Sequence, residues 1–111
     1  MPRKSMPDEV KQKAEQIIAR FNKRSLARTG SFYVPRWRGV FLFLDRVDHD
    51  MTSQICRLKY TGDIHKWEFA IFKYSSERYD PNEHWFPGAE CVDGTIEGAM
   101  KAGLKAYSKG R

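Results

Sequence analysis

The fold is decided by residues 40–74, which read VFLFLDRVDHDMTSQICRLKYTGDIHKWEFAIFKY. Residues 40–44 form an apolar run, and residues 54–60 and 66–74 alternate apolar with polar side chains, which is the period of a β-strand. A polar turn at residues 45–52 and another at residues 61–63 separate these segments, so the last two pair antiparallel. In the third segment, alternation places Trp67 and Ile71 on one face and Phe72 and Tyr74 on the other.

Two amphipathic helices flank these strands. Apolar residues recur at helical spacing over residues 10–21, after Pro7 and two acidic residues, and again over residues 96–107, after Asp93 as N-cap. We therefore predict one α+β domain over residues 1–111, in which an antiparallel sheet of three or four strands is flanked by an N-terminal and a C-terminal helix (α-β-β-β-α order). A short edge strand at residues 84–86 is the optional fourth, and residues 1–5 and 109–111 are expected to be flexible. The predicted core consists of Ile17, Phe21, Leu42, Leu44, Leu58, Trp67, Phe69, Ile71, Ile96, Met100 and Leu104.

Size and composition limit the class of protein. A chain of 111 residues with 41% hydrophobic content has room for one modest core. The longest apolar run, at residues 40–44, is far too short to span a membrane, and no secretory signal follows the basic N-terminus, so we expect a cytoplasmic protein. Cys56 and Cys91 belong to no Cys-x-x-Cys pair and are expected to be reduced thiols, although the sequence does not exclude a bridge between them.

Positive charge is concentrated at the two ends of the chain. The balance of Lys and Arg against Asp and Glu is +7 over residues 1–38, −4 over residues 39–93 and +3 over residues 94–111, which gives the net charge of +6. Basic edges on both helices attract polyanions by releasing their counterions, which favours DNA or RNA as the partner. The alternative is that these edges are the ordinary solvated faces of helices.

Residues 28–38 interleave arginine with aromatic residues. Rings that stack on unpaired bases, beside guanidinium groups that hold phosphates, grip a single strand, so this segment predicts nucleic-acid binding. An equally supported interpretation is that the rings complete the core and the arginines extend to solvent. The predicted interface consists of Lys13, Arg20, Arg24, Arg36, Arg38 and Lys101 as phosphate contacts, with Tyr33 and Trp37 as stacking rings.

The sheet face opposite the core is a second candidate platform. The alternation of side chains along the strands places on this face Arg57, Lys59, Phe72 and Tyr74. Phe41 and Phe43 are candidates for the same face. The RNA-recognition motif binds RNA on such a face. Residues 38–43 resemble the start of its main motif, but Val40 and Leu42 stand where that family has aromatic residues. The order of helices and strands differs as well, so we assign no membership.

Two further resemblances concern the whole domain. The α-β-β-β-α order resembles the double-stranded-RNA-binding domain, but residues 93–97 are acidic where that family has lysines at its second helix. The segments 55–63, 66–71 and 92–99 resemble small prokaryotic domains with no known activity. This last resemblance covers residues 54–107 at most, and it implies a self-standing domain without implying a function.

Catalytic motifs are absent from the sequence, and we expect no enzyme, no cofactor and no metal. His49, Asp50 and His84 lack the spacing of metal ligands, and no P-loop, nucleophile elbow or dinucleotide fingerprint occurs. The loop at residues 77–88 supports an alternative function. Tyr79, Trp85 and Phe86 are suited to anchor a protein partner or a second copy of the chain. The favoured interpretation of the loop itself is that it folds back and closes the end of the sheet with Trp85 and Phe86, because Pro81 and Pro87 fix it and Gly88 allows a tight return.

Overall fold

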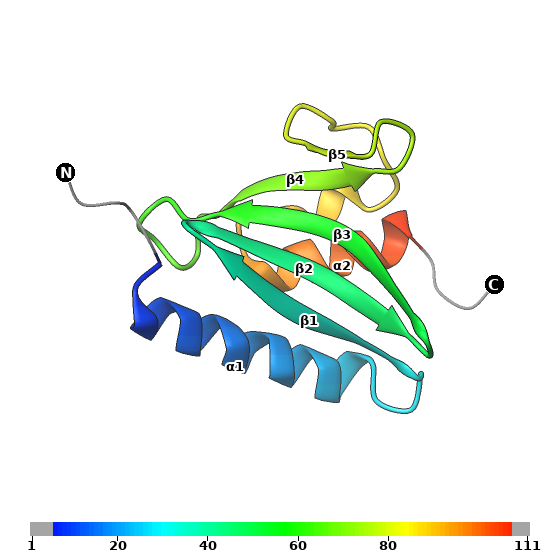
Figure 1. Cartoon of the computed structure of the whole chain (residues 1–111), viewed down its shortest axis with the longest axis horizontal. Coiled ribbons are helices and arrows are strands. Elements are labelled where there is room, and N and C mark those ends of the chain that lie inside the picture. The colour runs from blue at the N-terminus through cyan, green and yellow to red at the C-terminus, as the bar shows by residue number, and fades with distance from the viewer. Residues whose placement is uncertain (1–5, 108–111) are drawn as a thin grey trace.

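One antiparallel sheet carries both helices on the same face in the computed structural model, which describes residues 6–107 (Figure 1). The predicted α+β class and the helix–sheet–helix order are confirmed, but the sheet has five strands rather than three or four. The ends predicted to be flexible, residues 1–5 and 109–111, lie outside the described residues. The elements in chain order are α1 (Asp8–Ser25), β1 (Ser31–Arg38), β2 (Phe41–Asp48), β3 (Met51–Lys59), β4 (Glu68–Lys73), β5 (Arg78–Asp80), the 3-10 turn η1 (Ala89–Cys91) and α2 (Ile96–Ala106).

The two additional strands lie at the edges of the sheet, in the order β1-β2-β3-β4-β5. Pro35 pairs with Leu44 in β1, and a proline is tolerated there because an edge strand leaves one side of its backbone free. At the other edge, the short strand is residues 78–80, whereas the prediction at residues 84–86 was wrong. Strand β2 also continues to Asp48, so the predicted turn at residues 45–52 is confined to His49 and Asp50.

A β-bulge changes the facing of side chains in β3. Leu44 pairs with Cys56 and Asp45 pairs with Gln54, which leaves Ile55 as an extra residue. Its side chain is fully buried, so Ile55 lies in the core beside Cys56 rather than on the opposite face that strict alternation predicts. Arg57 keeps its predicted place on the face away from the core, opposite Ala70 of β4.

The core lies between the sheet and the two helices. Of the predicted core residues, Ile17, Phe69 and Leu104 are partly buried against it, and the others are buried. Tyr33 is also inside, with 1% of its surface exposed, and its hydroxyl donates a hydrogen bond of 2.8 Å to the carbonyl of Met100 in α2. Burial raises the pKa of this tyrosine well above its usual range.

A buried arginine attaches the end of α2 to the sheet. Arg46 of β2 is almost fully buried, and it donates to the carbonyl oxygens of Gly103, at 3.3 Å, and of Tyr107. Asp48 on the same strand balances its charge at 3.1 Å. The Gly103 carbonyl also accepts from the backbone N–H of Tyr107 at 2.9 Å, so the guanidinium adds a second bond there and supplies a donor to the carbonyl of Tyr107, at the end of the helix.

The free edge of β1 is occupied by a side chain of α1. The amide of Asn22 donates to the carbonyl of Tyr33 at 2.9 Å and accepts from its N–H at 2.8 Å, as a neighbouring strand would. Pro35, two residues on, has no N–H to offer. These two features keep another chain from pairing with this edge.

Local details at α2 and the cysteines complete the description. The N-cap is Thr95 rather than the predicted Asp93: its hydroxyl accepts from the N–H of Gly98 at 2.9 Å and donates to Asp93 at 2.6 Å. Cys56 is buried, Cys91 is half-buried, and they form no disulfide. Within residues 6–107, no helix combines the length and the apolar character needed to cross a membrane.

Candidate nucleic-acid interface

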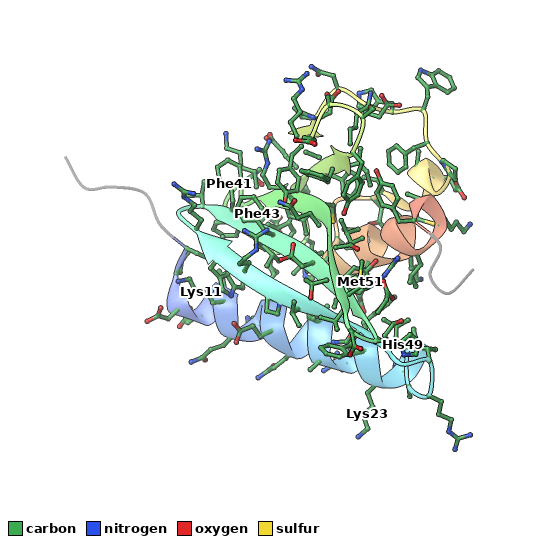
Figure 2. All side chains as sticks on the ribbon, turned by 45° about the vertical axis from the view of Figure 1, so that its right-hand side comes forward. Lys11, Lys23, Phe41, Phe43, His49 and Met51 are labelled. Atoms are coloured by element: carbon green, nitrogen blue, oxygen red, sulfur yellow. The ribbon has the colours of Figure 1, made fainter. Side chains whose placement is uncertain are left out.

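Both helices cover one face of the sheet, which leaves the other face open. Residues paired directly across two antiparallel strands point to the same side, so Leu42 and Leu44 of β2 define the covered face. Phe41 and Phe43 alternate with them and project from the uncovered face, whereas Lys23 projects from α1 away from the sheet (Figure 2). We call this uncovered face the open face. By strand register its side chains include Arg36, Arg38, Phe41, Phe43, Asp45, Gln54, Arg57, Lys59, Glu68, Phe72, which is buried, and Tyr79. Tyr74 follows β4 and lines a depression with Phe72 and Tyr79.

Guanidinium groups lie against aromatic rings on the open face. Arg36 lies 4.7 Å from the ring centre of Phe43, and Arg57 lies 4.7 Å from that of Phe41 and 5.6 Å from that of Tyr79. The rings of Phe43 and Tyr79 meet edge-on at 5.2 Å. Cation–π contacts of this kind hold arginine side chains in fixed positions above the sheet.

Hydrogen bonds fix one of these arginines further. Arg36 donates to both carboxylate oxygens of Asp45, at 2.8 and 3.1 Å, and to the hydroxyl of Tyr79 at 3.3 Å. The bonds to Asp45 raise the pKa of Arg36 above its usual value. Gln54 also donates to the Tyr79 hydroxyl, at 3.2 Å. Arg36 and Asp45 therefore neutralise one another, and Tyr79 is held from both sides.

A shallow depression between the ends of β1, β2 and β3 is lined by positively charged side chains and no negatively charged ones. Its lining, which we call the β1–β3 hollow, consists of Arg38, Gly39, Val40, Phe41, Phe43, Arg57 and Lys59. Three of these residues are cationic and none carries a carboxylate. The nearest acidic residue by strand register is Glu68, opposite Lys59, and it lies outside the lining.

A second depression lies beside the first and shares one residue with it. Its lining, the β3–β5 hollow, consists of Gln54, Arg57, Phe72, Tyr74, Glu77, Arg78 and Tyr79. The ring of Tyr74 is 48% exposed, and its hydroxyl donates to the carbonyl of Gln54 at 2.8 Å, which fixes the ring's orientation. The side chain of Phe72 supports it from below in an edge-on contact of 4.7 Å. Arg57 belongs to both linings.

Only part of the predicted interface lies on the open face. Arg36 and Arg38 are exposed there. Tyr33 and Trp37 point to the helix side instead, because Trp37 pairs with Leu42 in the register of β1 and β2. Tyr33 is buried, and the indole N–H of Trp37 donates to Glu15 of α1 at 2.9 Å. This placement withdraws both rings from the surface that carries Arg36 and Arg38.

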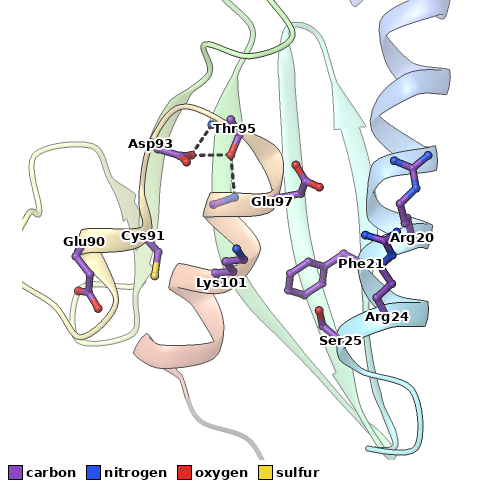
Figure 3. A pocket seen from close by; sticks show the side chains of 11 residues that line it. Arg20, Phe21, Arg24, Ser25, Glu90, Cys91, Asp93, Thr95, Glu97 and Lys101 are labelled. Carbon is purple, nitrogen blue, oxygen red and sulfur yellow. Dashed lines mark hydrogen bonds between the residues drawn. The ribbon is translucent and has the colours of Figure 1, made fainter.

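The predicted helix cations lie on the other side of the sheet. Arg20 and Arg24 of α1 face Lys101 of α2 across a cleft between the helices (Figure 3). The same cleft is lined by three carboxylates, which are Glu90, Asp93 and Glu97. Lys13, the remaining predicted phosphate contact, is exposed on α1 and outside this lining. The helix layer therefore presents a surface of mixed charge rather than a continuous basic one.

The residues predicted for the alternative protein interface do not form one surface. Tyr79 belongs to the open face, whereas Phe86 stacks on Phe69 of β4 at 5.9 Å, on the helix side. Trp85 is 91% exposed, on a turn where Glu83 accepts from its N–H. Sequence reasoning placed Tyr79 in the loop because the three-residue strand β5 was not foreseen. The aromatic residues beside Tyr79 on the open face, Phe43 and Phe72, were expected there from the alternation of side chains along their strands.

No metal site or known relative adds to this geometry. Within residues 6–107, no group of three His, Cys, Asp or Glu side chains is placed to hold a metal ion. Comparison of the chain with protein-family models, with curated proteins and with solved structures finds no match. Function is therefore inferred from the geometry of the described residues.

Proposed function

We propose that this chain is a nucleic-acid-binding module that contacts DNA or RNA through its open face. The observation that carries the proposal is the β1–β3 hollow, in which three cations surround two phenylalanine rings without any carboxylate. Lys and Arg that neutralise phosphates release counterions, and aromatic rings beside them offer surfaces on which bases stack. We keep the cytoplasm, expected from the sequence, as the proposed location.

The charge around each depression favours the sheet over the helices. Arg20, Arg24 and Lys101 share their cleft with three carboxylates, so an incoming phosphate would meet attraction and repulsion together. The lining of the β1–β3 hollow contains no carboxylate, and the neighbouring acids lie outside it: Glu68 is opposite Lys59, and Asp45 is bound to Arg36.

The experiment is a salt titration of binding, followed by the fluorescence anisotropy of a labelled oligonucleotide of mixed sequence. Three phosphate contacts predict a slope of about −2 for log affinity against log salt with a single strand. Affinity should then fall about 20-fold between roughly 50 and 200 mM salt. The proposal would be contradicted if the affinity did not change with salt, or if no binding were detected at the lower salt concentration.

Two double variants of equal charge locate the interface. Arg38→Gln with Lys59→Gln removes two exposed cations from the open face, and Lys13→Gln with Lys101→Gln removes two exposed cations from the helix layer. The first pair should reduce the salt slope to about −0.7 and weaken binding more than about tenfold at low salt. The second pair should leave affinity within about twofold. Equal losses would show that binding follows net charge and does not involve the open face.

The exposed Trp85 supports a second candidate function, which is contact with a protein partner or a second copy of the chain. An indole that is 91% exposed has no structural role in the fold and is of a type favoured as an interface anchor. Sedimentation at increasing protein concentration tests self-association. A mass that stays monomeric and does not change with Trp85→Ala would exclude the homodimer.

A further inference from the structure

Arg57 occupies the centre of the open face, where the two hollows meet. Its guanidinium carbon lies 4.7 Å from the ring centre of Phe41 and 5.6 Å from that of Tyr79. The side chain is half-buried, in contrast to the exposed Arg38 and Lys59 at the border. Arg57 is therefore held in place by two rings while part of it still reaches solvent.

A guanidinium in this setting offers more than charge. A nucleobase stacks on the flat guanidinium as it does on an aromatic ring. Because two rings already contact this side chain, binding has less side-chain motion to restrict. The exposed ring of Tyr74, fixed through its hydroxyl to Gln54, offers a second such surface in the next hollow. The flanking cations Arg38 and Lys59 lie on the other side of Arg57 and suit phosphates.

The dimensions of the open face fit a short nucleic-acid chain. From β1 to β5 there are four strand spacings of about 4.8 Å, so the two hollows together extend over roughly 19 Å. This length suits a short oligonucleotide, at the lower end of the roughly 4–16 nucleotides that single-strand-binding surfaces cover. Duplex bases present only their edges in the grooves, whereas a single strand exposes the base faces that stacking surfaces need.

We infer that the ligand is a single strand whose bases stack on Arg57 and Tyr74 across the two hollows. Its phosphates contact Arg38 and Lys59 at the border of the β1–β3 hollow, and the N–H groups at the edge of the Arg57 guanidinium supply the third phosphate contact. This inference rests on the proposed function, because it specifies which form of nucleic acid the same surface binds. Base–aromatic stacking tolerates any sequence, since every base has a flat face, so recognition depends on strandedness rather than on base identity.

The test compares variants that keep charge but change shape. Arg57→Lys retains the positive charge and loses the planar surface, and Arg38→Lys makes the same chemical change at the border of the hollow. Affinity is measured by anisotropy for a labelled six-nucleotide RNA, the same DNA sequence and a duplex containing it. The expected result is preference for either single strand over the duplex, a loss of about tenfold for Arg57→Lys, and a change under about twofold for Arg38→Lys.

Further readouts separate stacking from other effects. The salt slope of Arg57→Lys should equal that of the wild type, because the charge is unchanged. Tyr74→Leu, which keeps an apolar side chain without a ring, should cause a similar loss, and thermal unfolding of each variant shows whether it is folded. The RNA and DNA arms distinguish the source of the strand: equal affinities indicate stacking and phosphate contacts alone, and tighter RNA binding indicates an added contact to the 2′-hydroxyl.

Failure of the inference and failure of the proposed function give different results. Equal binding of duplex and single strand, with Arg57→Lys and Tyr74→Leu both unchanged from wild type, would overturn the stacking inference and leave nucleic-acid binding in place. Absence of binding to all three probes at low salt would overturn both.

Discussion

Replacement of Gly103 by alanine tests how closely α2 approaches the sheet. A Cβ added at this position would lie 2.5 Å from Cγ2 of Ile55 and 2.5 Å from the hydroxyl oxygen of Tyr33. Real Cβ atoms do not approach other atoms so closely, so α2 or these side chains must shift. Gly103 has an ordinary helical backbone, and the effect of the substitution comes from packing rather than from backbone strain.

The magnitude follows from three opposing contributions. Inserting a methyl group into a packed core costs about 1–3 kcal/mol, and displacement of the Tyr33 hydroxyl from the Met100 carbonyl costs about 1 kcal/mol more. Alanine favours a helix over glycine by about 1 kcal/mol, which offsets part of this loss. We therefore expect Gly103→Ala to reduce the free energy of unfolding by about 1–3 kcal/mol.

Urea unfolding followed by far-ultraviolet circular dichroism measures this loss as a lower midpoint at unchanged slope. With a slope of about 1–3 kcal/mol per M, a loss of 2 kcal/mol, the middle of the expected range, lowers the midpoint by about 1 M. Lys101→Ala, on the exposed side of the same helix, is the control and should change stability by less than about 0.5 kcal/mol. In a Tyr33→Phe background, which removes one of the two obstructing atoms, the Gly103→Ala penalty should be smaller. A variant as stable as the wild type, or more stable, would refute the close approach.

Three further outcomes are expected. Asn22→Ala leaves the edge of β1 without its hydrogen-bonding partner and should lower the free energy of unfolding by about 1–3 kcal/mol in urea. Burial raises the pKa of both Cys56 and Tyr33, so the unfolded state loses these protons first. Stability should be constant up to about pH 8.5 and then fall, by about 1.4 kcal/mol per pH unit for Cys56 and by a similar further amount for Tyr33 above about pH 10. Urea unfolding between pH 7 and about pH 10.5 measures this, and Cys56→Ala should lack the first decline. Trp85→Ala should change the free energy of unfolding in urea by less than about 0.5 kcal/mol, since its side chain is 91% exposed to solvent.

The helices could be predicted from sequence because their periodic patterns are long, and the edge strands could not because they are short or interrupted. Pro35 is compatible with a strand only at the edge of a sheet. Whether β1 lies at an edge depends on how the strands assemble, which the sequence of β1 does not show. Strand β5 has three residues, too few to show alternation. The bulge at Ile55 depends on the pairing of β3 with β2, so its burial cannot be read from β3 alone.

The candidate site was predicted in part for a related reason. Both faces of β1 carry large or aromatic residues, with Tyr33 and Trp37 on one side and Phe32 on the other, so its own pattern does not identify the core side. The register with β2 decides it, because Trp37 pairs with Leu42. In β3, by contrast, Cys56 and Leu58 mark one apolar face around Arg57, and Arg57 was correctly expected to point away from it.

The positive charge on the ends of the chain is a poor guide to the charge of its surfaces. The middle segment, with a balance of −4, contributes Arg57 and Lys59 to a hollow that contains no carboxylate. Several acids of the segment are paired with cations: Asp45–Arg36 lies on the open face beside the hollow, and the other pairs are Asp48–Arg46, Glu83–Lys73 and Glu90–Lys105. The basic helices, meanwhile, bring Arg20, Arg24 and Lys101 into a cleft with an equal number of carboxylates. A phosphate responds to charges within about a Debye length of it, near 8–10 Å at physiological salt, so local pairing outweighs the sum over a segment. For this fold, then, the sheet is the better place to look for a polyanion, although the helices carry more of the charge.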